Sequence, residues 1–198
     1  NMKGEGIKRR AIAYLIDMLL CAIVILVCTT FLKPKQNVAV LNLELNTINE
    51  LALNHEISIN TYLNRYADII HDLDREKVMV NLINCIFIMG YFVILPYFFE
   101  GQTLGKRIMG LKIRRRDGEL LMLTDLIIRN LIINGLGFLL ISLCILYIAP
   151  SMIYFIVATL LGILQILLVI VSVFMVIYRK DNRGLHDVLS ETIVVREK

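Results

Sequence analysis

The chain has 198 residues, of which 58% are hydrophobic, and its mean hydropathy is +0.72. Soluble domains are about 45–50% apolar, so this composition excludes an ordinary water-soluble fold. The net charge of +4 is modest, and we expect no nucleic-acid partner.

Apolar segments long enough to cross the hydrocarbon core of a bilayer, which takes about 20 residues, occur four times. They are residues 11–32, 81–99, 130–148 and 151–178. Asp17 is the only charged residue inside them, and Pro150 leaves only a tight connection between the last two. The sequence therefore predicts an all-α membrane protein with four transmembrane helices, folded as a single membrane domain over residues 1–198.

Lysine and arginine residues gather in three of the segments that flank the predicted spans. These are the N-terminus up to Arg10, residues 100–129 and the tail after residue 178. Residues 33–80 instead carry five basic and seven acidic side chains. Because basic loops stay on the cytoplasmic side, we expect both termini in the cytoplasm and residues 33–80 outside it.

The extracytoplasmic segment has the apolar spacing of helices. Pro34 should end the first span, because proline cannot continue a helix. The spacing beyond it predicts an extracytoplasmic helical extension over about residues 36–80, inserted between the first and second spans. From residue 61 nothing breaks the pattern before residue 99, so we predict one long helix that stands out of the membrane, kinked at its cytoplasmic end by Pro96.

The cytoplasmic segment between the second and third spans predicts a short helix at the membrane surface. Leu104, Ile108 and Leu111 recur at helical spacing within about residues 102–112. Basic side chains occupy its other faces, and they are Lys106, Arg107 and Lys112. We therefore expect a cytoplasmic interfacial helix whose cations contact anionic lipid headgroups.

Two local motifs follow this helix. Asp117-Gly118 is a tight-turn dipeptide between LKIRR and ELLML, which predicts a small β-hairpin. Thr124 is a candidate cap for the third span. Asp125 and Arg129 are four residues apart at its start, and we expect them to pair.

Asp17 lies about two helical turns inside the first span, on the face that it shares with Arg10 and Tyr14. A charged side chain near the centre of a membrane costs about 2.5–3.5 kcal/mol, so this carboxylate needs a cation, water or a proton. Arg129, at the start of the third span, is the best candidate partner. Two roles remain open for Asp17: an ion pair that locks helices together, or a group that binds a cation or a proton.

The other polar residues inside the spans are neutral. Asn130 and Asn134 are four residues apart in the third span, and Gln165 and Ser172 lie in the fourth. Such groups need hydrogen-bond partners in lipid, so we expect them to face the interior of the bundle. They either hold helices together or, for the two asparagines, complete an ion or proton site with Asp17.

Three patterns that carry chemistry in other proteins are weak here. GQTLGK has one residue too few between its glycines for a phosphate loop, and no Ser or Thr follows its lysine. His186-Asp187 has no nucleophile at a matching spacing. The cysteines lack the spacing of a zinc site, and they are Cys21, Cys28, Cys85 and Cys144. We expect no enzyme activity, no cofactor and no metal site.

Four stretches, taken together and in this order, resemble the sequence blocks of the RDD family of small integral membrane proteins. They are RRAIAYLID, GQTLGKRIMGLKIRRRDG, LIIRN and NRGLHDVLSETIVV. The family is named for one arginine and two aspartates, which the resemblance places at Arg10, Asp17 and Asp187. One departure is Glu191, which stands where the family usually has a small glycine, so its bulk opposes tight packing there.

The resemblance also implies which residues form the site at the cytoplasmic side. A structural motif consists of Gly101, Gln102, Thr103, Gly105, Lys106 and Gly110. A charge network consists of Arg10, Arg107, Arg129, Arg183 and Asp187. Within it, we expect Asp187 to pair with Arg107, Arg129 or Arg183 and to act as a latch.

Members of this family are generally proposed to be transporters, and some are described as antiporters that exchange a monovalent cation for protons. The resemblance therefore implies a small multi-pass transporter of the bacterial plasma membrane, with Asp17 as the exchanging group. Four helices barely enclose a pathway, so we expect a homo-oligomer. The alternative is a non-transporting scaffold or receptor whose extracytoplasmic helices bind a partner.

Overall fold

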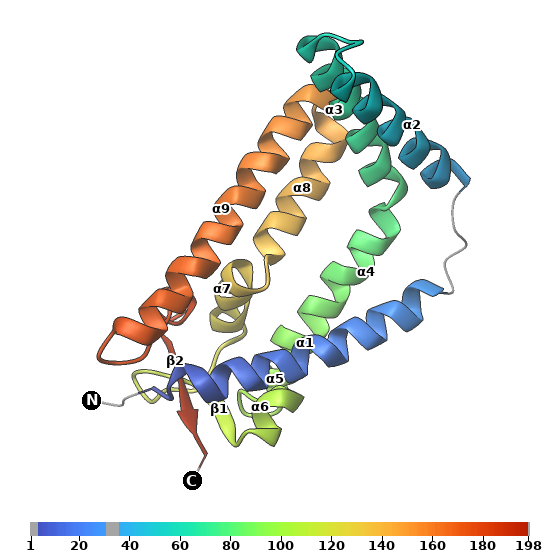
Figure 1. The fold of residues 1–198 in the computed structure, drawn as a ribbon. Coiled ribbons are helices and arrows are strands. Elements are labelled where there is room, and N and C mark those ends of the chain that lie inside the picture. Colours follow the sequence, from blue (N-terminus) through green and yellow to red (C-terminus); the bar gives the residue numbers. More distant parts are fainter. Residues whose placement is uncertain (1–3, 31–35, 198) are drawn as a thin grey trace.

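The computed structural model describes residues 4–30 and 36–197 (Figure 1). Its helical segments are α1 (Ile7–Thr30), α2 (Gln36–Leu53), α3 (Ile59–Glu76), α4 (Val78–Ile88), the π-helical η1 (Met89–Ile94), α5 (Leu95–Phe98), α6 (Leu104–Ile108), α7 (Leu123–Ile133), α8 (Leu136–Ile148), α9 (Ser151–Tyr178) and α10 (Leu185–Leu189). Its strands are β1 (Leu111–Arg115) and β2 (Thr192–Arg196). The prediction that Pro34 ends the first span lies outside the described residues.

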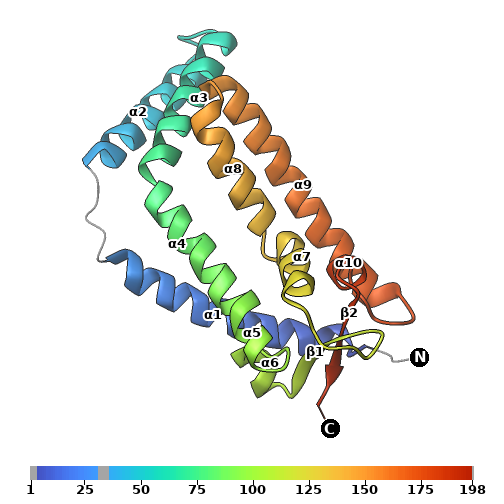
Figure 2. The same cartoon turned by 180° about the vertical axis from the view of Figure 1, so that it is seen from behind.

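The long helices run between two ends of the molecule, as Figures 1 and 2 show. α8 and α9 form a hairpin, α4 lies beside α8, and α1 crosses near the end that holds the two strands, called the strand end below. α1, Val78–Phe98 and α9 are each long and apolar enough to cross a membrane, and α7 with α8 adds a fourth candidate span. The predicted multi-pass, mostly helical membrane fold is therefore confirmed.

The third predicted span, residues 130–148, is not one continuous helix. α7 and α8 replace it and meet at an angle of 75°. Gly135 between them has a φ of 65°, a left-handed conformation that glycine adopts without steric cost. The break leaves carbonyl groups at the end of α7 without helical donors, and the Gln165 amide of α9 donates to one of them, Ile132 O, at 2.5 Å.

The predicted long helix over residues 61–99 is present as four consecutive pieces, α3, α4, η1 and α5. Lys77 interrupts it, with φ and ψ of −91° and 3°. The π-helical turn η1 ends two residues before Pro96, which has no N–H to continue the α-helical hydrogen bonds. The Asn130 amide of α7 donates at 3.0 Å to the carbonyl that thereby loses its α-helical donor, Phe92 O.

α2 and α3 occupy the segment in which the sequence predicts extracytoplasmic helices. They pack against each other through Ile48, Ile69 and Leu73, which are buried. The Tyr154 hydroxyl of α9 donates to Asp74 of α3 at 2.7 Å. The outer part of the predicted long helix therefore lies against the α8–α9 hairpin and does not stand free.

The strands pair differently from the sequence prediction. β1 runs antiparallel to β2, from Leu111 opposite Arg196 to Arg115 opposite Thr192. The predicted hairpin between LKIRR and ELLML is therefore wrong, because the C-terminal strand takes the place of ELLML. Turn signals report only neighbours in the chain, and β2 is distant in sequence.

The predicted interfacial helix over residues 102–112 is shorter than expected. α6 has five residues, and Gly110, with a φ of 62°, turns the chain into β1. Lys112 therefore lies on a strand, where its buried ammonium is 3.3 Å from Glu197. Of the three cations predicted to contact lipid headgroups, only Arg107 is exposed.

The start of α7 also differs from the prediction. Met122, and not Thr124, precedes the first turn, and Asp125 accepts a hydrogen bond from the Met122 N–H at 2.9 Å. Asp125 lies 3.9 Å from Arg115 of β1, and the predicted ion pair with Arg129 does not form. A carboxylate in the first turn is stabilised by the free N–H groups and by the helix dipole.

Both ends of the described chain lie together at the strand end (Figure 1). The Glu5 N–H donates to Val194 O at 2.8 Å. A buried apolar cluster that includes Leu111, Ile113 and Leu126 joins the sheet to α7. This arrangement agrees with termini on one side of the membrane, and the assignment of that side to the cytoplasm depends on the charge asymmetry.

Candidate functional site

Asp17 of α1 is fully buried and accepts hydrogen bonds at both carboxylate oxygens. Its Oδ1 accepts from the Tyr91 hydroxyl at 2.6 Å and from the Gly105 N–H at 2.7 Å. Its Oδ2 accepts from the Thr103 hydroxyl at 2.5 Å, and the Lys106 ammonium lies 4.0 Å away. One carboxylate therefore joins α1, η1 and the segment around α6, and its donors compensate for the loss of water.

Small residues let the chain around α6 reach this carboxylate. Thr103 precedes α6 and caps it. A Cβ added at Gly105 would lie 2.2 Å from the Ala13 carbonyl oxygen of α1, so only glycine permits this approach. Gly101 has a φ of 82°, and a Cβ there would lie 2.1 Å from the Ile113 carbonyl oxygen. Gly101 and Gly105 therefore allow backbone segments to touch.

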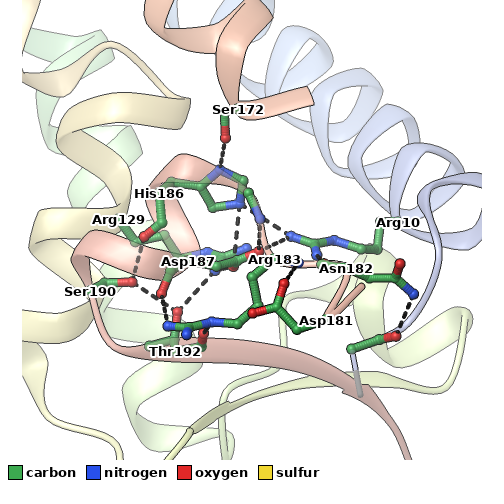
Figure 3. A network of polar contacts seen from close by, with 12 residues as sticks. Arg10, Arg129, Ser172, Asp181, Asn182, Arg183, His186, Asp187, Ser190 and Thr192 are labelled. Carbon is green, nitrogen blue, oxygen red and sulfur yellow. Dashed lines mark hydrogen bonds and ion pairs between the residues drawn. The ribbon is translucent and has the colours of Figure 1, made fainter. Parts of the chain in front are cut away.

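A second buried carboxylate, Asp187 of α10, is the centre of a denser network (Figure 3). Its Oδ2 accepts from Arg10 of α1 at 2.5 Å and from the Gly184 N–H at 2.9 Å. Its Oδ1 pairs with Arg129 of α7. Arg183 donates to the backbone carbonyl of Asp187 at 2.8 Å. α1, α7 and α10 therefore meet at this one acid.

His186 links this network to α9 (Figure 3). Arg10 Nη2 lies 3.2 Å from its Nε2, and Ser172 of α9 is hydrogen-bonded to its Nδ1. A guanidinium only donates, so Nε2 accepts and the ring proton is on Nδ1. Burial, and after it the charge of Arg129, lowers the pKa of His186 to about 3. The ring is therefore neutral at physiological pH.

A chain of neutral polar groups connects α1, α7 and η1. The Tyr14 hydroxyl donates to Asn134 Oδ1 at 2.9 Å, and Asn134 Nδ2 donates to Asn130 Oδ1 at 2.5 Å. Asn130 Nδ2 in turn donates to Phe92 O. These contacts fit the first of the two roles open for the asparagines, in which they hold helices together.

A cavity of about 300 Å³ adjoins both networks. Its charged lining residues are Arg10, Lys106 and Arg129. Its neutral polar lining residues are Tyr14, Asn130, Asn134, Ser172 and His186. The rest of the lining is apolar and comes mainly from α1, α7, α9 and the two strands. Neither Asp17 nor Asp187 lines it.

The structure brings most of the predicted site residues together at the strand end. Asp187 pairs with Arg129, one of the three partners expected for it, and Arg10 joins them. Arg107 is exposed and does not contribute to this network. The predicted pairing of Asp17 with Arg129 is wrong, because Asp187 binds that guanidinium.

Two contributors were not among the site residues expected from the sequence. Tyr91 donates a hydrogen bond to Asp17. The only feature of the sequence that points to it is a phenol hydroxyl inside an apolar span, which needs a hydrogen-bond partner. His186 was set aside because no nucleophile accompanies it, yet it is buried within the ion-pair network. Gln102 of the motif donates to Leu111 O at 3.1 Å and to Glu197 at 2.8 Å, so it holds the motif against the sheet.

Glu191, the departure from the family pattern, has a backbone conformation that explains why the family usually has glycine at this position. Its φ is 51°, in the left-handed region, which costs other residues about 1–2 kcal/mol. Its side chain is exposed and lies 3.3 Å from Arg115. The exposed side chain therefore does not disturb tight packing, contrary to the expectation from the sequence. The cost of having glutamate here lies in its left-handed backbone conformation.

Comparison with known families agrees with this geometry. The model of the RDD family matches residues 5–191, which include α1, the α6–β1 segment, α7 and α10. Comparison with curated proteins and with solved structures gave no match. The matched range contains both aspartate networks and most of the chain. The chain therefore belongs to the RDD family of membrane proteins.

Proposed function

We propose that this protein is a small transporter whose ligand site is the cavity beside the two aspartate networks. The cavity itself is the observation that supports the proposal: about 300 Å³ of space lined by helices and strands of a small membrane protein. Binding sites for small molecules combine apolar walls with a few charged or amide groups, as this lining does. Ionisable groups within a membrane bundle are costly, and they commonly mark ligand or ion pathways.

Irregular helices border the cavity, which also supports a transport function. Asn134 lies at the bend between α7 and α8, and Phe92 lies in the π-helical turn η1. Both residues line the cavity. Broken and irregular helices are tolerated in membranes where they line ligand sites, and transporters use them for this purpose.

A substitution that fills the cavity tests this proposal. Val169 of α9 lines the cavity, whereas Val171 of the same helix does not and is 46% exposed. Val169→Phe should reduce transport by about tenfold or more because the added ring occupies ligand space. Val171→Phe makes the same chemical change on another face and should leave transport unchanged.

Purified protein in proteoliposomes provides the measurement. An internal pH-sensitive dye reports proton movement after a Na⁺ or K⁺ gradient is imposed, and labelled hexanesulfonate reports the uptake of an organic anion. The proposal is wrong if the wild-type protein moves none of these probes. It is equally wrong if Val169→Phe transports as well as Val171→Phe.

The family resemblance places cation–proton exchange at Asp17, but the contacts of Asp17 favour a structural role. An incoming cation would have to displace donors from Tyr91, Thr103 or Gly105. We expect Asp17→Asn to lower the free energy of unfolding by about 1–3 kcal/mol. One carboxylate oxygen that accepts hydrogen bonds becomes an amide NH₂ group, which cannot accept from the donors that face it. The folded fraction should transport like the wild type.

Thermal unfolding and flux, measured on one preparation of Asp17→Asn, separate the two roles. A lower melting temperature with normal flux supports the structural role. Lost proton movement at an unchanged melting temperature would identify Asp17 as the exchanging group.

A scaffold or receptor is the second candidate, and the outer helices favour it. Val40 and Leu43 of α2 are 58% and 67% exposed, so this helix presents apolar side chains away from α3. A partner helix that packs on α2 would bury them. This candidate becomes the better one if the wild-type protein moves neither cations, protons nor hexanesulfonate.

A further inference from the structure

We infer that the cavity binds organic anions, with the negatively charged head among Arg10, Lys106 and Arg129 and the hydrocarbon body along the apolar wall. The inference names the ligand class of the proposed transporter, and it rests on the cavity being the ligand site. It differs from the family resemblance, which implies a cation.

The charged part of the lining is positive. Arg10, Lys106 and Arg129 line the cavity, and no acid does so among the residues that the structure describes. Asp187 pairs with the guanidinium groups of both Arg10 and Arg129, so its single negative charge balances only one of their two positive charges. A cation in the cavity would meet this excess of positive charge at low dielectric, whereas an anion would compensate for it.

Lys106 is the cation with the weakest compensation. Its ammonium is 4.0 Å from the nearer oxygen of Asp17, and that carboxylate already accepts hydrogen bonds from three other donors. Its closest polar contact is the Thr103 hydroxyl at 3.3 Å. An ammonium has three N–H groups, so Lys106 keeps donors for a ligand head.

The remaining wall of the cavity favours an anion with an apolar body. Val169, Val173 and Val176 of α9 line it together with Leu111 and Val194 of the strands. An inorganic anion would leave these side chains without a partner. A hydrocarbon chain that covers them gains about 25 cal/mol for each Å² of apolar surface removed from water.

Anion binding should be coupled to proton uptake. Burial, and after it the charge of Arg129, lowers the pKa of Lys106 to about 8. A bound anion favours the charged ammonium and raises this pKa, so binding at pH 8 should take up about half a proton and binding at pH 6 almost none. The charged or titratable groups that face Lys106 are Arg10 and Asp17 of α1, Arg129 of α7, and His186 and Asp187 of α10.

Three probes that share one hydrocarbon chain test the inference: hexanesulfonate, hexanol and hexyltrimethylammonium. Each is titrated calorimetrically into the protein in phosphatidylcholine nanodiscs, and hexanesulfonate should bind about tenfold more tightly than the other two. Lys106→Gln should weaken hexanesulfonate binding by roughly tenfold or more. Lys112→Gln removes a buried lysine outside the cavity and should leave the affinity unchanged.

The conservative variant separates charge from titration. Lys106→Arg keeps the positive charge but does not titrate near neutral pH. It should bind hexanesulfonate as the wild type does and take up no proton at pH 8, which a pH-indicator dye in weak buffer measures. Nanodiscs that contain phosphatidic acid show whether the natural anion is a lipid or a soluble molecule. If the site takes a lipid headgroup, phosphatidic acid competes and weakens hexanesulfonate binding. If the site takes a soluble anion, the affinity for hexanesulfonate is the same as in phosphatidylcholine nanodiscs, and either result supports the anion site.

Equal or tighter binding of hexyltrimethylammonium, or an unchanged affinity in Lys106→Gln, would overturn the inference. Hexanesulfonate binding without any transport in proteoliposomes would keep the anion site and remove the proposed transport function. Cation–proton exchange without hexanesulfonate binding would remove only the inference.

Discussion

Replacing Asp187 by asparagine is expected to unfold the strand end, at a cost of about 3–5 kcal/mol in the free energy of unfolding. Arg10 and Arg129 both lose their counter-charge in a buried site. The new amide N–H groups would face guanidinium groups, which cannot accept a hydrogen bond. A large decrease in melting temperature, or loss of the monodisperse peak in size-exclusion chromatography of the solubilised protein, would show this effect.

Asp181→Asn is the matched control, because it makes the same change at a partly exposed ion pair. Asp181 pairs with Arg179 at 3.0 Å, and the two side chains are 30% and 42% exposed. Exposed pairs contribute about 0–1 kcal/mol, so this variant should melt close to the wild type. If both variants lose equal stability, burial of the Asp187 network is not the cause.

A double-mutant cycle keeps this prediction testable even when the single variant is poorly folded. Arg10→Gln combined with Asp187→Asn removes a guanidinium together with its counter-charge. The double variant should therefore lose less stability than the sum of the two single variants. Additive losses would mean that Arg10 and Asp187 act independently.

The acid dependence of stability should change in the same variant. Burial alone would raise the pKa of Asp187, but the charges of Arg129 and Arg10 hold it well below its ordinary value. A lowered pKa in the folded state stabilises the protein fully above the unfolded-state pKa of about 4, and this stability is lost as the pH falls further. Asp187→Asn should lack this part of the acid transition.

The spans and the two aspartates could be predicted from the sequence because they depend on local features. Continuous apolar length identifies membrane helices without knowledge of their neighbours. Asp17 stands out because it is a lone charge inside such a stretch, and Asp187 because it lies in a recognisable block. Asp17 is buried, as expected of a lone charge inside a span, and Asp187 is buried as well, which the sequence did not predict.

The partners of these residues could not be predicted, because each lies far away in the chain. The sequence favoured Arg129 for Asp17 by charge, whereas the actual donors are hydroxyl groups and one backbone N–H. Arg10 reaches Asp187 because the C-terminal segment lies beside α1, where β2 pairs with β1 and Asn182 contacts Gly4. Likewise, Gly135 looks like an ordinary residue of a span, and only the backbone shows the bend that it allows.

Replacing Gly105 by alanine is expected to separate α6 from α1. The added Cβ would lie 2.2 Å from the Ala13 carbonyl oxygen and 2.8 Å from the Asp17 carboxylate. The first neighbour is helix backbone and the second is held by its own donors, so relief of either clash moves a helix. Overpacking costs about 1–3 kcal/mol, and loss of the Gly105–Asp17 hydrogen bond adds about 1–3 kcal/mol. The total loss should be at least about 2 kcal/mol.

Gly90→Ala provides the comparison that isolates this clash. A Cβ at Gly90 meets no atom within 4 Å, and alanine is favoured over glycine in helical segments by about 1 kcal/mol. Thermal unfolding in one detergent should therefore show Gly90→Ala at or above the wild-type melting temperature and Gly105→Ala well below it. If Gly105→Ala melts like the wild type, α1 and α6 do not need backbone contact. The structural role proposed for Asp17, which holds α1 and α6 together, would then lose its support.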